Sequence, residues 1–315
     1  MSILICGASG FIGRNIYEHF QKQHDVFGTY FRSKPFNREL IKANLTNKIE
    51  VDKIIKDKNI IIQAAATTSG AKDILTKPYY HVTDNAVMNS LIFRSAFENR
   101  VSHVIFFSCS SIYQQNGKKL LDETDLNLNK GPFQSYFGVG WTKIYIEKLC
   151  EFYSRISDTK YTVIRHSNIY GPYDKFDLER SHVFGATVTK VMTAKDKIIV
   201  WGDGEEKRDL LYVSDLVDFV NLILKKQKSK FEIYNIGYGS SISINELVKK
   251  VMSHAKKNLK IEFNLSKPTI KTNICIDTFK ANQLGWLRKV TFDQGIEKTI
   301  KWGNENSIWN NYDYR

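Results

Sequence analysis

The first half of the chain alternates short apolar runs with segments whose apolar residues recur every three or four positions. The runs have the length of buried β-strands, and the recurring segments have the period of amphipathic helices. This alternation predicts an α/β fold: a doubly wound parallel sheet of the Rossmann type, with helices on both faces. Strands are predicted over residues 3–6, 26–31, 60–64, 104–108 and 162–165, and helices over residues 10–21, 49–56, 85–98 and 142–154.

The pattern loosens after about residue 166. We expect a Rossmann domain over residues 1–166, to which later segments can return, and mainly a ligand-binding lobe over residues 167–315. A cleft between the two is the expected ligand site. Residues 235–239 and 240–243 resemble loops. Residues 183–192, 198–201, 215–225, 245–254, 260–263 and 291–301 are predicted to form this smaller mixed α/β lobe.

Three glycines, Gly7, Gly10 and Gly13, follow the first predicted strand and open the first predicted helix. Glycine is required where the backbone turns sharply, approaches a pyrophosphate, or lets a helix pack closely on a strand. The helix N-terminus adds free N–H groups and a positive dipole. The segment therefore predicts a dinucleotide site, with a GxxGxxG spacing in place of the commoner GxGxxG.

The end of the second strand carries Arg32 where NAD-binding proteins usually place an acidic residue. A guanidinium matches the 2′-phosphate of NADP, which favours that cofactor. Arginine can also stack on adenine and leave the ribose 2′-hydroxyl to water. Arg32 therefore does not decide between NAD and NADP as the cofactor.

The net charge is +13, which suits a diphosphate-bearing ligand and cofactor. Because the basic residues are mostly dispersed lysines, we expect no nucleic-acid partner. No apolar run approaches the ~20 residues of a membrane span, and the N-terminus lacks a signal-peptide core, so a cytosolic location is expected. Cysteines at positions 6, 109, 150 and 275 form no CxxC pair, which predicts neither a metal site nor a disulfide framework.

The glycine loop, together with the run from Arg165 to Pro172, resembles the extended short-chain dehydrogenase/reductases that modify nucleotide-sugars. The resemblance covers essentially the whole chain, including residues 234–237 and 284–286. It implies NAD or NADP as cofactor, a nucleotide-sugar lobe and a homodimer. It also implies cofactor contacts from Gly7, Ser9, Gly10, Phe11, Ile12, Gly13, Arg32, Asn44, Leu45, Ala64, Ala66, Lys143 and His166.

Within these enzymes the second half resembles the GDP-fucose synthases. Their Ser-His-Val segment, whose histidine is an active-site acid, matches residues 181–183. Residues 199–204 with Arg208 match their nucleotide-holding segment, and Lys267 matches a phosphate-side lysine. The implied contacts to a GDP-sugar come from Asn168, His182, Val183, Val200, Trp201, Arg208 and Lys267.

The catalytic positions depart from the family pattern. The family uses Tyr-x-x-x-Lys, but Val139 stands four residues before Lys143 and cannot carry a proton. Tyr136 lies seven residues before Lys143, ~10 Å away along a helix, and is expected to approach only if the helix breaks at its two glycines, residues 138 and 140. Cys109 replaces the usual Ser or Thr, and Ser111 takes the place of an epimerising cysteine.

A protein with the GDP-sugar-binding residues but without the epimerising cysteine indicates an oxidoreductase acting at C4 of the sugar. The chain resembles the NAD-dependent GDP-manno-heptose 4-dehydrogenases of capsule pathways, which share its Gly-Val-Gly-Trp-Thr-Lys segment, and this resemblance favours NAD. A nucleotide-sugar 4-epimerase or 4-keto-sugar reductase, and a non-catalytic dinucleotide-binding subunit, stay open. The candidate catalytic residues are Lys143, Cys109, Ser110, Ser111, Tyr136 and His182.

Overall fold

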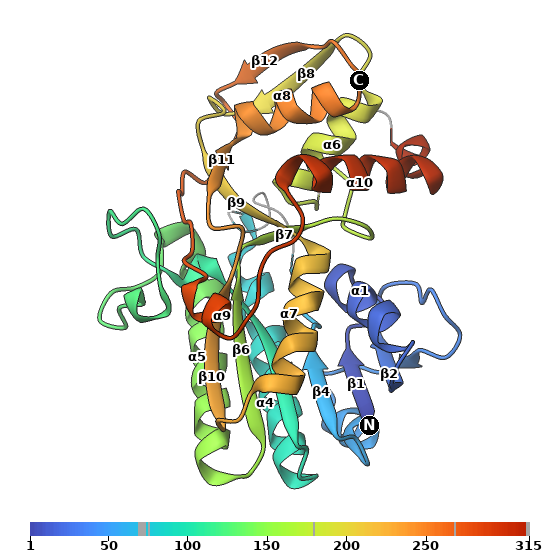
Figure 1. Cartoon of the computed structure of the whole chain (residues 1–315), viewed down its shortest axis with the longest axis vertical. Coiled ribbons are helices and arrows are strands. Elements are labelled where there is room, and N and C mark those ends of the chain that lie inside the picture. Colours follow the sequence, from blue (N-terminus) through green and yellow to red (C-terminus); the bar gives the residue numbers. More distant parts are fainter. Residues whose placement is uncertain (69–73, 75, 179, 268, 313–315) are drawn as a thin grey trace.

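A central parallel sheet organises the computed structural model, which describes residues 1–68, 74, 76–178, 180–267 and 269–312 (Figure 1). Its strand order is β10-β6-β5-β4-β1-β2-β3, and each neighbouring pair is parallel. This confirms the predicted Rossmann-type fold. The strands are β1 (Ser2–Cys6), β2 (Asp25–Tyr30), β3 (Ile41–Lys42), β4 (Ile60–Gln63), β5 (His103–Cys109), β6 (Lys160–His166) and β10 (Phe231–Ile236).

Helices cover both faces of this sheet, so successive residues of one strand enter different cores. In β1, Ile3 and Ile5 pack with α1 (Phe11–Phe20) and α7 (Val213–Lys226). Leu4 packs on the other face with α2 (Lys48–Ile55), α4 (Thr83–Glu98) and α5 (Phe137–Ile156). Within the described residues, no helix is both long and apolar enough to cross a membrane.

A smaller lobe stands beyond one end of the sheet (Figure 1). It has its own apolar core, and it combines a three-stranded sheet ordered β11-β9-β7 with the parallel pair β12-β8. Its strands are β7 (Asn168–Tyr170), β8 (Lys197–Trp201), β9 (Lys207–Tyr212), β11 (Ser241–Ser243) and β12 (Lys260–Asn264). Its helices are α6 (Val183–Thr193), α8 (Ile244–His254) and α10 (Phe292–Glu305), while the short α9 (Phe279–Gln283) lies near β10.

Four sequence predictions are wrong at the level of elements. Residues 215–225 belong to α7, whose apolar side packs on the central sheet and not in the smaller lobe. The predicted loop at 235–239 begins with the last two residues of β10, and the predicted loop at 240–243 contains β11. The helix predicted to begin at residue 142 begins at Phe137. Its first turn contains two glycines, which disfavour a helix and hid this start from the sequence pattern.

Candidate functional site

The turn after β1 is shaped so that two of its positions accept only glycine. Gly7 has a φ of +77°, and a Cβ there would lie 2.7 Å from the Cα of Ala65. A Cβ on Gly13 would lie 2.2 Å from the carbonyl oxygen of Gly7. Gly10 donates its N–H to that same carbonyl at 2.9 Å and starts α1, whose first turn holds no acidic residue. The helix N-terminus is thus open to a diphosphate, and the cradle fits a dinucleotide.

The other predicted cofactor residues follow the carboxyl ends of the parallel strands, where ligands of doubly wound sheets bind. Arg32, just beyond β2, is 68% exposed, with Asp84 at 4.0 Å. The Asn44 side-chain oxygen accepts hydrogen bonds from the N–H and hydroxyl of Thr46, at 3.1 and 2.8 Å. Ser9, Phe11 and Ile12 lie in the turn and the first turn of α1, Leu45 follows β3, Ala64 and Ala66 follow β4, and His166 ends β6.

The candidate reactive groups meet beside this cradle. Cys109 ends β5 directly opposite His166 in the β5–β6 register, and its Sγ lies 2.9 Å from the Ser111 hydroxyl. The Lys143 ammonium donates to the carbonyl of Phe107 at 2.7 Å. Burial lowers the pKa of Lys143, while the nearby thiol of Cys109 acts in the opposite direction. Cys109 and Lys143 therefore lie within electrostatic reach of each other.

Val139 and Tyr136 occupy the start of α5. Gly138 and Gly140 do not break the helix: α5 begins after Tyr136 and runs through both glycines. A Cβ at Gly140 would lie 2.6 Å from the Pro132 ring, which explains a glycine inside the helix. Tyr136, in the preceding 3₁₀ turn, nevertheless lines the adjoining cavity. Val139 has no polar side-chain atom.

Two histidines face the same region as neutral bases. The ring of His166 hydrogen-bonds through Nδ1 to the Ser167 carbonyl oxygen at 2.6 Å, and burial lowers its pKa to about 4. His182, at the N-terminus of α6, stays open to solvent. The surrounding protein and the positive charges of Lys175 and His81 lower the pKa of His182 as well. Ser110 lies in the 3₁₀ turn that follows Cys109.

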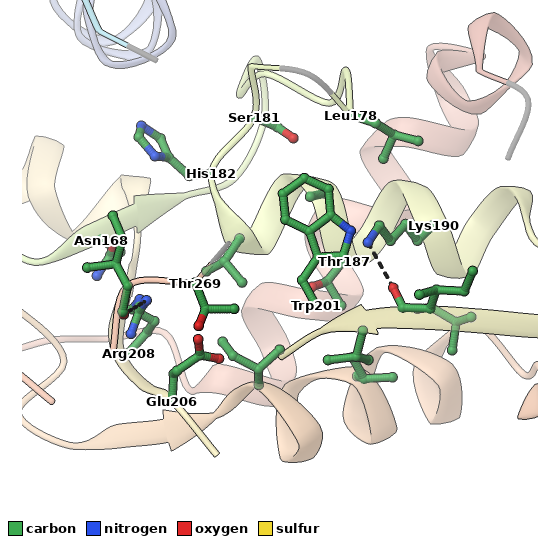
Figure 2. Close-up of a pocket in the computed structure, with 18 of the residues that line it drawn as sticks. Asn168, Leu178, Ser181, His182, Thr187, Lys190, Trp201, Glu206, Arg208 and Thr269 are labelled. Atoms are coloured by element: carbon green, nitrogen blue, oxygen red, sulfur yellow. Dashed lines mark hydrogen bonds between the residues drawn. The ribbon is translucent and has the colours of Figure 1, made fainter. Parts of the chain in front are cut away.

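A cavity of about 190 Å³ continues from this region into the smaller lobe, between α6 and strands β8 and β9 (Figure 2). The Arg208 guanidinium donates to the carbonyls of Ile270 and Thr272 at 2.9 and 3.0 Å. Lys267 lies with its ammonium 5.7 Å from the centre of the Trp201 ring. Six of the seven predicted substrate residues line the cavity: Asn168, His182, Val183, Val200, Trp201 and Arg208.

Two charged residues of this cavity were missed by sequence reasoning, Lys190 and Glu206. The Lys190 ammonium donates to the carbonyl of Ile199 at 2.9 Å and lies 5.3 Å from the Trp201 ring centre. Burial, with a contribution from Lys267, lowers the pKa of Lys190 to about 8. The spacing of residues 183, 187 and 190 puts them on one helical face, a signal that could have identified Lys190.

A sequence model of the NAD dependent epimerase/dehydratase family matches residues 3–237, most of the chain. The chain belongs to this family. Among the relatives of this epimerase/dehydratase-family enzyme, GDP-L-colitose synthase of Yersinia pseudotuberculosis is 29% identical, with 96% of this chain and 97% of that protein covered. GDP-L-fucose synthase of Sinorhizobium fredii is 31% identical, with 82% and 84% covered. The resemblance drawn from the sequence is confirmed.

Solved structures of the family show the same fold. A GDP-D-glycero-L-gluco-heptose synthase from Campylobacter jejuni, crystallised in the presence of NADPH, matches with a TM-score of 0.83 at 21% identity. The match covers 96% of this chain and 98% of that one. This epimerase/dehydratase-family protein is thus an NAD(P)-dependent enzyme of the oxidoreductase or epimerase type.

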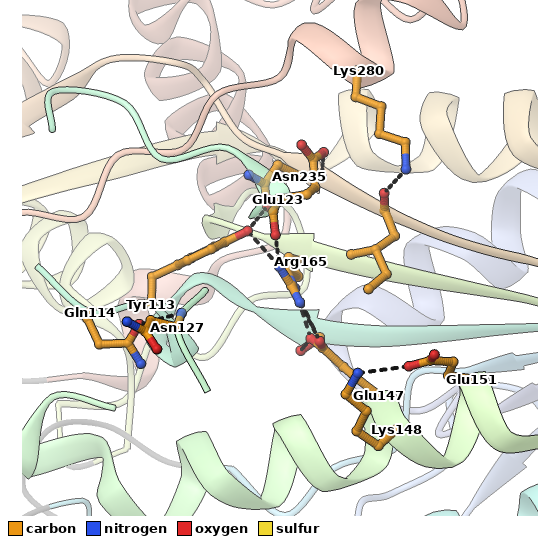
Figure 3. A network of polar contacts seen from close by, with 12 residues as sticks. Tyr113, Gln114, Glu123, Asn127, Glu147, Lys148, Glu151, Arg165, Asn235 and Lys280 are labelled. Carbon is orange, nitrogen blue, oxygen red and sulfur yellow. Dashed lines mark hydrogen bonds and ion pairs between the residues drawn. The ribbon is translucent and has the colours of Figure 1, made fainter. Parts of the chain in front are cut away.

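A buried polar network fixes the reactive groups of this epimerase/dehydratase-family enzyme in place (Figure 3). The Arg165 guanidinium donates to the Glu147 carboxylate at 2.7 Å and to the Tyr113 hydroxyl at 2.9 Å. That hydroxyl donates to the Asn235 amide oxygen at 2.8 Å. Ser108 completes the network by donating to Glu147 at 2.5 Å. The network joins β5, α5, β6 and β10 directly beside Cys109, Lys143 and His166.

Proposed function

We propose that this protein is an NAD-dependent oxidoreductase acting at C4 of a GDP-sugar, with GDP-manno-heptose as substrate, in the synthesis of capsule or surface polysaccharide. The observation that carries the proposal is the replacement of the family tyrosine by Val139 beside an intact Lys143 and dinucleotide cradle. The curated relatives act on GDP-linked sugars, as their names state, which supports the guanine nucleotide.

The cavity of the smaller lobe suits a nucleoside diphosphate. Trp201 offers a flat ring to a base, and Arg208 offers a fork of donors to a diphosphate. Lys190 and Lys267 both lie within 6 Å of the Trp201 ring centre, which adds positive charge on that side. We therefore place the nucleotide in the smaller lobe and the sugar toward Cys109, between the lobes.

We assign Cys109 as the group that accepts the proton of the sugar C4 hydroxyl. When bound, the nicotinamide ring of the cofactor supplies the hydride acceptor for the C4 hydrogen. Cys109 reacts as a thiolate, whose charge the nearby Lys143 ammonium balances, and becomes a neutral thiol when it takes the hydroxyl proton. Loss of this proton together with the C4 hydride leaves a 4-keto sugar. Ser111, 2.9 Å from the Cys109 sulfur, orients the thiol.

Tyr136 suits binding better than proton transfer. Burial raises its pKa, although Arg208 and a hydrogen bond with the Thr272 hydroxyl oppose this shift. A phenol whose pKa is raised is a poor base near neutral pH. We assign Tyr136 to contact with the sugar or the diphosphate, and Ser110 to hydrogen bonding of a sugar hydroxyl.

The reverse hydride transfer, reduction of a 4-keto sugar, would use the same groups, with Cys109 donating a proton. A solved structure with the same fold, named as a GDP-6-OMe-4-keto-L-xylo-heptose reductase from C. jejuni, supports this second candidate. The exposed Arg32 is compatible with the 2′-phosphate of NADPH as well as with NAD.

The test incubates the purified protein with GDP-manno-heptose, GDP-mannose and UDP-glucose in the presence of NAD. The proposal predicts that GDP-manno-heptose loses two mass units while absorbance at 340 nm rises. Loss of two mass units from the UDP-sugar alone would contradict the guanine nucleotide. Reduction of a 4-keto GDP-sugar by NADPH, without any oxidation by NAD, would establish the reductase instead.

We also propose a homodimer formed through α4 and α5, which lie side by side and expose apolar side chains. On these helices Phe97, Tyr145, Phe152 and Ile156 are between 36% and 52% exposed. Light scattering should give twice the chain mass of 36.4 kDa for the wild type and a lower mass for Phe152→Glu. A monomeric wild type would contradict this part of the proposal.

A further inference from the structure

A carboxylate that the proposed reaction does not use lines the nucleotide cavity. Glu206 lies in the turn between β8 and β9, five residues after Trp201 and two before Arg208. It is only 8% exposed. Figure 2 shows its carboxylate pointing into the cavity toward Thr269, with Arg208 to one side and Trp201 to the other.

Nothing in the described part of the chain donates a hydrogen bond to this carboxylate or pairs with it. Its oxygen Oε1 would lie 3.6 Å from a Cβ placed on Gly202, which positions the group at the corner next to Trp201. Lys271 is within electrostatic reach of Glu206 but forms its ion pair with Asp203, at 2.9 Å. Its oxygens remain accessible from the cavity, since they are not among the buried polar atoms without a partner. A carboxylate withdrawn from water is costly unless donors surround it, so a ligand that fills the cavity must supply donors of its own.

The order of the lining groups indicates which part of the ligand supplies these donors. With the base on Trp201 and the diphosphate on Arg208, the group between them is the ribose. The diphosphate has no donors and would repel a carboxylate, whereas the ribose presents two adjacent hydroxyls. Acidic side chains hold ribose hydroxyls in the same way in dinucleotide sites.

We propose that Glu206 accepts hydrogen bonds from the 2′- and 3′-hydroxyls of the substrate nucleotide, so that the pocket selects ribonucleoside over 2′-deoxyribonucleoside diphosphates. This inference rests on the proposed binding of a nucleotide-sugar in the cavity. The smaller lobe would then select the ribose of the nucleotide separately from the base.

The test compares GDP with 2′-deoxy-GDP by titration calorimetry, using the wild type, Glu206→Ala and the near-isosteric Glu206→Gln. The control is Asp203→Asn, because Asp203 lies in the same turn but outside the cavity lining. The wild type and the control should bind GDP about 10- to 100-fold more tightly than 2′-deoxy-GDP, the value of a hydrogen bond to a charged group. Glu206→Ala should bring the two affinities within about threefold, and circular dichroism checks its folding.

The ratio of the two affinities is the measured quantity because removing a negative charge near a diphosphate also changes both affinities together. Equal affinities in the wild type, or a ratio unchanged by both substitutions at Glu206, would overturn the inference. Equal weakening of GDP and 2′-deoxy-GDP by Glu206→Ala would also overturn it, by assigning the carboxylate to the base.

A parallel pair, UDP and 2′-deoxy-UDP, separates this inference from the proposed function. If only the uridine nucleotides bind, with a ribose preference that Glu206→Ala removes, the inference stands and the GDP-sugar function fails. If GDP binds without any ribose preference, the inference fails and the GDP-sugar function is untouched.

Discussion

Replacing Glu147 by glutamine tests whether the buried network holds the reactive groups in place. The Glu147 carboxylate accepts from Arg165 at 2.7, 3.1 and 3.2 Å and from Ser108 at 2.5 Å. Both members of the ion pair have side chains only 4% exposed. The neutral amide keeps the shape of the glutamate but leaves the guanidinium charge of Arg165 uncompensated in the core.

The expected cost is about 3–5 kcal/mol of unfolding free energy, the usual effect of removing one partner of a buried pair. With a urea m-value of about 3 kcal/mol/M, the midpoint of unfolding should fall by about 1–2 M. The assay is urea unfolding followed by circular dichroism. Catalysis should fall as well, because Ser108 and Arg165 directly precede Cys109 and His166.

The matched control is Glu151→Gln, one helical turn further along α5 (Figure 3). Glu151 pairs with Lys148 at 2.8 Å and with Arg155, but these two side chains are 57% and 72% exposed. Surface pairs of this kind contribute less than about 1 kcal/mol each. If Glu147→Gln were no less stable than Glu151→Gln, the reasoning about the buried network would be refuted.

Three further substitutions follow from the structure. Gly13→Ala, whose Cβ would lie 2.2 Å from the Gly7 carbonyl oxygen, should weaken dinucleotide binding in a fluorescence titration by more than about tenfold; unchanged affinity would contradict the cradle. Cys109→Ala should lower kcat for sugar oxidation by about 100-fold, with KM little changed and a smaller loss for Cys109→Ser; an unaltered kcat would remove Cys109 from the reaction. Burial lowers the pKa of His103 from 6.5 to about 4, so its contribution to stability is present above pH 6.5 and is lost as the pH falls toward 4. The wild type should lose about 2–3 kcal/mol more than His103→Gln between pH 7 and 4.5, measured by urea unfolding; equal losses would show that His103 is not the group responsible.

Local patterns predicted the central sheet and the cofactor turn well. The apolar runs at residues 3–6 and 60–64 became β1 and β4, because a strand buried on both faces must be apolar along its whole length. The glycine turn was recognisable because its steric demands arise from residues close in sequence, with Ala65 as the one distant contact.

Elements with polar sequences and long-range partners escaped prediction. β11 is a three-residue strand with two serines, and it exists because it pairs with β9, more than thirty residues earlier in the chain. The side of the sheet covered by α7 depends on packing against α1, which no local period reveals.

The same limit applies to the candidate site. Lys190 and Glu206 come from a helix and from a turn, and they meet around Trp201 through the tertiary fold. Tyr136 was judged by its distance along a helix, yet it reaches the cavity from the turn before α5. Sequence identified which residue types were present, and the fold determined which of them share a cavity.

The central claim is hydride removal from C4 of a GDP-sugar, and a single-turnover experiment with GDP-manno-heptose deuterated at C4 tests it most directly. The enzyme is mixed with the labelled sugar and NAD, quenched, and both the dinucleotide and the sugar are analysed by mass spectrometry. The account predicts that the deuterium appears in the reduced dinucleotide and that the sugar is recovered as the 4-keto product. Recovery of the deuterium on the sugar, with no labelled dinucleotide, would contradict it.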